Sequence, residues 1–187
     1  FMKSRTRNEN WAVYHKFDGG TDGRSFLNLN TTGAKFDNGP NSYFQDTPPT
    51  NSVFYQNGST YNVNGATYIA YCFHSVDGFS RAGVYRGNAL SNGMFVFTGF
   101  RPAFILTKSI AAGTDWAIYD NKRLGYNVDN NIMRIGQSSA PTEQTDDDID
   151  LLSNGFKLRR SSPNFNNAQL FVFLAFAEQP FKYANAR

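Results

Sequence analysis

Residues that could perform acid or base chemistry are few in this 187-residue sequence and lie far apart. Glycoside hydrolysis needs two carboxyl groups about 5–10 Å apart. Glutamate occurs only at Glu9, Glu143 and Glu178. Asp115 and Asp120 are five residues apart, so on a strand they should point to opposite faces. The sequence therefore offers no catalytic pair of carboxylates.

Nucleophilic chemistry also lacks a recognisable pattern. The histidines are His15 and His74 and the single cysteine is Cys72, with no phosphate-binding loop, CxxC pair or metal-ligand spacing. One cysteine excludes an intrachain disulfide, and its place in the apolar run YIAYCF predicts a small buried hydrophobe. We expect no catalytic residue and no cofactor.

One acidic stretch could attract calcium, which prefers several oxygen ligands. Its candidate ligands are Asp146, Asp148 and Asp150. The stretch lacks the glycine and the distal glutamate of a helix-loop-helix calcium site. A solvated acidic loop is the interpretation that we favour, and we expect no metal.

Contact residues are the remaining candidates. In the strand patterns WAVY and WAIY, large apolar residues alternate with others, so Trp and Val or Ile should face inward and tyrosine outward. Aromatic rings beside polar groups can stack on sugars, but they also dominate protein interfaces. Of these two roles we favour the protein interface. The candidate contact residues are Tyr14, His15 and Lys16, and Tyr119, Asp120, Asn121 and Arg123.

These strands belong to a sequence repeat. Trp11 and Trp116 are 105 residues apart, and so are the pairs Lys3-Ser4 and Lys108-Ser109. Further on, a run similar to the apolar run at residues 67–79 occurs at 170–181, with Phe73 matching Phe176. A period of this length has the size of a small domain. We predict a first unit at residues 1–79 and a second at 80–187.

The two units are unequal in extent. The second has a lead-in at residues 83–105 whose counterpart would lie ahead of Phe1. We therefore expect that the sequence is a fragment, and that the first unit is incomplete at its N-terminal side.

Composition points to strands throughout. Aromatic residues make up 16% of the chain, and short strand signals alternate with Gly, Asn and Pro clusters. Asn57-Gly58 and Asn154-Gly155 predict tight turns. The sequence predicts an all-β fold of two tandem antiparallel β-sandwich units, jelly-roll or lectin-like. The strands predicted in the second unit are 83–86, 94–98, 103–108, 116–120, 132–135, 156–159 and 170–177.

Charge and hydropathy exclude two classes of partner. The net charge of +3 is dispersed, whereas nucleic acid binding draws its affinity from a continuous basic surface. No stretch of the sequence approaches the roughly 20 apolar residues of a membrane span. We expect neither nucleic acid binding nor membrane insertion.

The motifs as a set resemble a known kind of module. Matching pieces lie at residues 11–16, 29–32, 68–73, 83–88, 93–104, 115–123, 152–159 and 175–187. They resemble a module from the C-terminal parts of large structural proteins of bacteriophages, especially marine ones, with a sandwich like those of concanavalin or laminin G.

The resemblance implies a non-catalytic structural protein of the virion, tail-fibre-like or surface-decorating, that mediates assembly or host attachment. Its implied partners are other virion subunits in a homo-oligomer, or a glycan of the host surface. A carbohydrate-binding adhesin is the alternative function, and a polysaccharide-degrading enzyme is a third.

Overall fold

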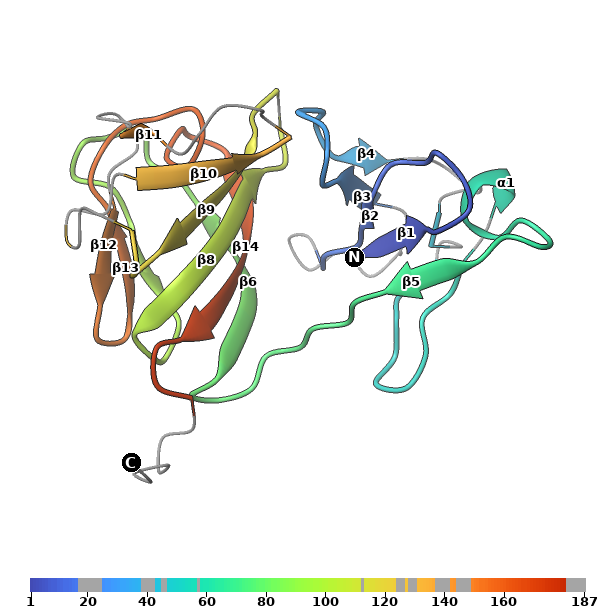
Figure 1. Ribbon diagram of the computed structural model, residues 1–187. Helices are drawn as coiled ribbons and strands as arrows, with labels where there is room; N and C mark the ends of the chain where they lie inside the picture. The colour runs from blue at the N-terminus through green and yellow to red at the C-terminus, as the bar shows by residue number, and fades with distance from the viewer. Residues whose placement is uncertain are drawn as a thin grey trace. The chain divides into compact units, whose positions relative to one another are not determined.

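The computed structural model describes residues 1–16, 25–37, 43–44, 47–56, 58–111, 113–123, 127, 131–136, 142–143 and 149–180. The fold is all-β with antiparallel sheets, as the sequence predicts, and its one described helix, α1 (Gly58–Tyr61), has four residues (Figure 1). The chain divides into two compact units, Phe1–Cys72 and Phe73–Arg187. Each unit is described separately below.

Unit 1 contains one five-stranded sheet in the order β4-β3-β2-β1-β5 (Figure 1). An apolar cluster lies on one face of this sheet, where Tyr61 of α1 and Phe44 pack with Met2, Ala12 and Phe26. A helical turn and a loop thus cover the sheet of unit 1. Its strands are β1 (Met2–Ser4), β2 (Ala12–Val13), β3 (Ser25–Asn28), β4 (Phe36–Asp37) and β5 (Tyr68–Ala70).

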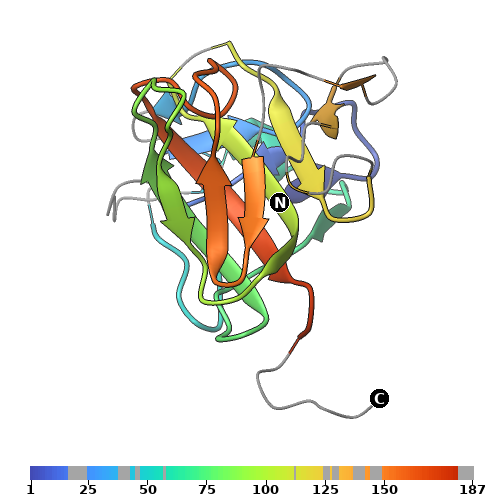
Figure 2. The same ribbon diagram turned by 90° about the vertical axis from the view of Figure 1, so that its left-hand side faces the viewer.

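Unit 2 contains a six-stranded sheet in the order β11-β10-β9-β8-β14-β6 and a three-stranded sheet in the order β12-β13-β7. Figure 2 shows β12 and β13, in orange, in front of the larger sheet. The strands of the larger sheet are β6 (Ser80–Arg86), β8 (Pro102–Ser109), β9 (Trp116–Asp120), β10 (Asn131–Ile135), β11 (Thr142–Glu143) and β14 (Leu170–Ala177). Those of the smaller sheet are β7 (Phe95–Phe97), β12 (Ile149–Leu152) and β13 (Gly155–Leu158).

The two sheets of unit 2 share one apolar core. Tyr85 of β6 stacks on Phe171 of β14 at 5.0 Å between ring centroids, and its edge meets Phe156 of β13 at 5.8 Å. Phe173 of β14 likewise contacts Phe156, at 5.7 Å. Burial of these rings drives the packing of one sheet on the other.

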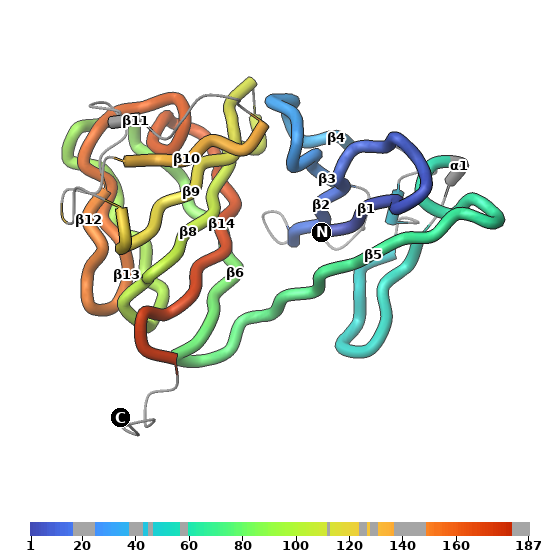
Figure 3. Tube along the Cα trace, in the orientation of Figure 1, coloured from blue at the N-terminus to red at the C-terminus, as the bar shows by residue number. Residues whose placement is uncertain are grey.

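The sequence repeat reappears as a repeat of strand pairing. β1 and β2 pair Met2 with Ala12, and β8 and β9 pair Thr107 with Ala117, each residue 105 positions later. The strands β1 to β4 and β8 to β11 form successive antiparallel neighbours in both units, a path that Figure 3 traces. By this register Trp11 and Trp116 are equivalent, although Trp116 begins β9 whereas Trp11 immediately precedes β2.

The registers also agree at the last strand of each repeat. β1 pairs with β5 through Met2 and Ala70, and β8 pairs with β14 through Thr107 and Phe173. Ala70 and Phe173 are 103 residues apart, which is also the spacing of Phe73 and Phe176 in the sequence repeat. β5 is thus the counterpart of β14. In the described part of unit 1, no strand corresponds to β6, β7, β12 or β13.

Candidate contact surfaces

The prediction that Tyr119 faces outward is wrong. Tyr119 and Ala117 lie in the core of unit 2, where Tyr119 is 1% exposed and its edge meets the Phe165 ring at 6.2 Å. Trp116 and Ile118 occupy the opposite face of β9 and are also buried. The strand is apolar on both faces, so alternation could not show which face holds the core.

Tyr14, the counterpart of Tyr119, also packs inward. It is half-buried against the core of unit 1, with its ring 5.4 Å from that of Phe44. His15 is half-buried and Lys16 is exposed. The two tyrosines therefore do not form an outward-facing aromatic surface, contrary to the prediction from strand alternation.

Asp120, Asn121 and Arg123 do lie together, in the turn after β9. The Asp120 carboxylate accepts hydrogen bonds from the backbone N–H groups of Lys122 and Arg123, at 3.0 and 3.1 Å. It also pairs with the Arg123 guanidinium at 2.7 Å. These bonds fix the turn, so the first role of Asp120 is structural.

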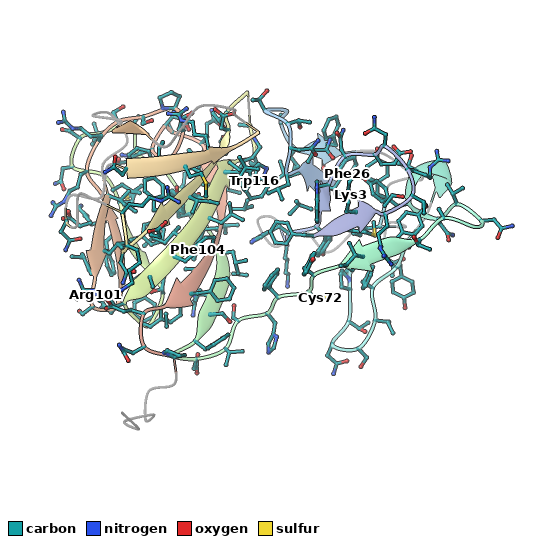
Figure 4. The ribbon with its side chains drawn as sticks, in the orientation of Figure 1. Lys3, Phe26, Cys72, Arg101, Phe104 and Trp116 are labelled. Atoms are coloured by element: carbon teal, nitrogen blue, oxygen red, sulfur yellow. The ribbon has the colours of Figure 1, made fainter. Side chains whose placement is uncertain are left out.

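Two residues that sequence reasoning missed complete this polar cluster. The Asn121 amide donates to Glu178 at 2.7 Å, and Glu178 pairs with Arg101 at 3.3 Å. Arg101 precedes β8 and Glu178 follows β14, and Figure 4 marks Arg101 near the start of β8. Antiparallel pairing of β8 with β14 brings these strand ends together. The sequence signal that could have identified Arg101 and Glu178 is a charged residue at the end of each apolar strand.

Of the three candidate calcium ligands, Asp150 alone lies among the described residues. Asp150 lies in β12 and pairs with the Arg159 guanidinium, whereas Asp146 and Asp148 lie outside the described residues. In the part of the chain that the structure describes, no group of three or more His, Cys, Asp or Glu residues could hold a metal. Asp150 therefore acts in an ion pair.

The repeated Lys-Ser pair has a structural role. The Lys3 ammonium donates to the Glu9 carbonyl and the Lys108 ammonium to the Thr114 carbonyl, so each lysine fastens the loop between the first two strands of its repeat. Burial lowers the pKa of Lys108 to about 8, and nearby Asp115 opposes this shift. The two hydrogen bonds account for the lysine of each pair at the period of 105.

The largest departure from expectation is β5 and the segment that follows it. Ile69 is 37% and Tyr71 48% exposed, and Cys72, predicted to be buried, is exposed (Figure 4). Their counterparts 103 residues later, Val172, Leu174 and Ala175, are buried. The same apolar strand is therefore covered in unit 2 and exposed in unit 1. Sequence reasoning missed this surface because exposure depends on neighbouring strands.

Comparisons with known proteins identify the family of this chain. Searches among curated proteins and among solved structures returned no match. Among the described helices, none is long and apolar enough to span a membrane. Residues 1–180 match a family described as a domain of unknown function, DUF7483. Because this match covers nearly the whole chain, the protein belongs to the DUF7483 family.

Proposed function

We propose that the chain is a non-catalytic structural module of a bacteriophage virion, tail-fibre-like or surface-decorating, that works by contact with neighbouring subunits. The observation that carries the contact function is the exposed apolar strand of unit 1. Its counterpart β14 lies in the middle of a sheet, between β8 and β6. A contiguous exposed apolar segment commonly marks an interaction site.

The finer fold assignment is part of the proposal. Unit 2 is a β-sandwich of the lectin-like or jelly-roll kind, supported by its two sheets and their common core. Unit 1 is an incomplete copy, supported by the equal registers of β1 to β5 and their counterparts. The exposed apolar residues of β5 and the segment after it support contact with a neighbouring subunit as the role of this unit.

The virion setting rests on the motif resemblance, which extends along most of the sequence. Its expected partners are other virion subunits, with the chain in a homo-oligomer, and its location is the particle surface or tail. A glycan of the host surface is the alternative partner. Packing of Tyr14 and Tyr119 into cores removes the aromatic surface that first suggested sugar binding.

The proposal is tested by locating the chain and by assaying for bond cleavage. Cryo-electron microscopy of intact particles should place the chain at a subunit contact, and purified protein should leave polysaccharides uncleaved. A location outside any virion would refute the proposal. Cleavage that disappears in an Asp115→Asn or Asp120→Asn variant would instead identify an enzyme, and glycan binding without subunit contacts would favour the adhesin.

A further inference from the structure

The outer face of the smaller sheet of unit 2 carries two exposed phenylalanines. Phe95 and Phe97 lie two residues apart in β7, so they project from the same face, whereas Val96 between them belongs to the core. Phe95 is 41% and Phe97 54% exposed. Figure 2 looks onto this face, with β12 and β13 in front of the larger sheet. Two large aromatic rings therefore lie on one sheet face in contact with water.

The register of the sheet shows what lies beside the two rings. Phe97 is opposite Gly155 and Phe95 is opposite Lys157 of the neighbouring strand β13. A Cβ atom at Gly155 would come within 2.8 Å of the Phe95 ring and 2.2 Å of the Val96 carbonyl oxygen. The Phe95 ring therefore covers the backbone of β13 at a position where only glycine leaves room for it.

Cations lie next to the two rings. The Arg81 guanidinium of β6 lies 5.9 Å from the centroid of the Phe97 ring, a cation–π distance, and among the described residues no carboxylate pairs with it. The Lys157 ammonium donates to a backbone carbonyl. The Asp150 carboxylate, opposite Lys157 in the register, is paired with Arg159. At this face the cations outnumber the carboxylates, which favours an anionic partner.

The size of the face limits the kind of partner that it can bind. Its strands have three or four residues each. At about 4.8 Å between strands and about 3.4 Å per residue, the face measures roughly 10 by 12 Å. A stable protein interface takes about 800 Å² from each partner, so this face offers roughly a sixth of the required area. It matches a ligand of one or a few rings instead.

The chemistry of the face distinguishes among such ligands. A sugar ring can stack its apolar C–H face on an aromatic ring, while its polar groups bond to side chains nearby. Arginine binds a carboxylate through two parallel N–H···O bonds. A single-stranded nucleic acid also stacks on aromatic rings, but it needs a groove of cations that follows several phosphates, which a face of this size does not provide. The combination therefore favours an acidic sugar.

We propose that the outer face of the smaller sheet binds a carboxylate-bearing sugar residue of a glycan, which stacks on the phenylalanine rings and pairs with Arg81. The inference goes beyond the proposed contact function, because it assigns a ligand to a surface of unit 2 that contact through β5 does not use. A single site of this size binds weakly, and several copies in one assembly would raise the avidity.

The test uses the whole chain with trigalacturonate, trimannuronate and sialyllactose. The methyl ester of each glycan is the matched control, because it keeps the sugar rings and removes the charge. Binding is followed by the shifts of backbone amide NMR signals during titration. We expect saturable binding of at least one acid, at least ~10-fold tighter than its ester, which corresponds to about 1.4 kcal/mol. Equal binding of acid and ester would overturn the proposal.

Three variants of the chain locate the binding site. Phe97→Ala removes an exposed ring and Arg81→Gln removes the cation beside it, whereas Arg86→Gln makes the same change of net charge at another exposed position of β6. Circular dichroism and urea unfolding check that each variant is folded. The first two should weaken binding at least ~10-fold and Arg86→Gln less than ~2-fold. Equal weakening by the two arginine variants would indicate unspecific attraction and refute the site.

The remaining outcomes separate the possible occupants and the two proposals. Tighter binding of a short oligothymidylate than of any glycan would identify a nucleic-acid surface, and a dimer abolished by Phe97→Ala would identify a contact between copies. Either result would overturn the glycan site. Failure of all three glycans to bind would refute this inference without affecting a location in the virion. Glycan binding by a chain found outside any virion would refute the proposed function alone.

Discussion

Replacement of Tyr119 by alanine tests the assignment of this ring to the core of unit 2. The side chain is 1% exposed and belongs to the cluster formed by both sheets. A buried aromatic side chain removes roughly 150–250 Å² from water, which at about 25 cal/mol per Å² corresponds to about 4–6 kcal/mol. Alanine retains part of this burial, so Tyr119→Ala should lower the free energy of unfolding by about 3–5 kcal/mol.

The matched comparison is Tyr14→Ala, at the equivalent position of unit 1. Tyr14 is only half-buried, so its loss should cost about 1–3 kcal/mol. Each unit contains one tryptophan, Trp11 or Trp116, so urea titrations followed by fluorescence in Trp11→Phe and Trp116→Phe backgrounds report on the units separately. A cost below about 1 kcal/mol for Tyr119→Ala would contradict the placement of the ring in the core.

Two further predictions concern buried polar groups of unit 2. Asn166 is fully buried; its amide donates to the Leu90 and Arg160 carbonyls at 2.8 and 2.7 Å, and its oxygen accepts from the Asn88 N–H at 3.0 Å. Asn166→Ala should therefore lower the free energy of unfolding in urea by roughly 2–4 kcal/mol. A loss under about 0.5 kcal/mol would refute this role. Burial raises the pKa of the Tyr85 hydroxyl, although a hydrogen bond with Thr107 lowers it. Because the folded-state pKa exceeds the unfolded value of about 10, stability should fall above pH 10 by up to about 1.4 kcal/mol per pH unit. Tyr85→Phe should flatten that decline, and an unchanged slope of unfolding free energy against pH would contradict it.

The repeat and the most apolar strands could be predicted from the sequence because they leave strong local signals. Strands β9 and β14 have the predicted bounds, and Asn154 and Gly155 lie at the turn and strand start that follow β12. Strand β12 was missed because its acidic neighbours masked the alternation of Ile149 and Leu151 with Asp150. In the first Asn-Gly pair, Asn57 lies outside the described residues and Gly58 begins the helical turn α1, which the strand pattern did not predict.

The candidate site was harder to predict, since it depends on contacts between distant segments. The turn of Asp120 and Arg123 was found because its residues are adjacent in sequence, whereas Glu178 is 57 residues from Asn121 and meets it through strand pairing. Exposure of Cys72 could not be read from an apolar run, because the matching run in β14 is equally apolar and is buried. Local patterns predict strands, but they do not show which strands lack neighbours.

Amide hydrogen exchange in β5 and the residues after it tests the proposed contact function most directly. The rates at Tyr68, Ala70 and Cys72 would be compared between the purified chain and the native assembly that contains it, with Tyr71, already bonded to Phe1, as the internal reference. Contact through β5 in the assembly predicts exchange slowed at least ~10-fold at these three amides and little changed at Tyr71. Equal rates at the three amides in both states would contradict the account.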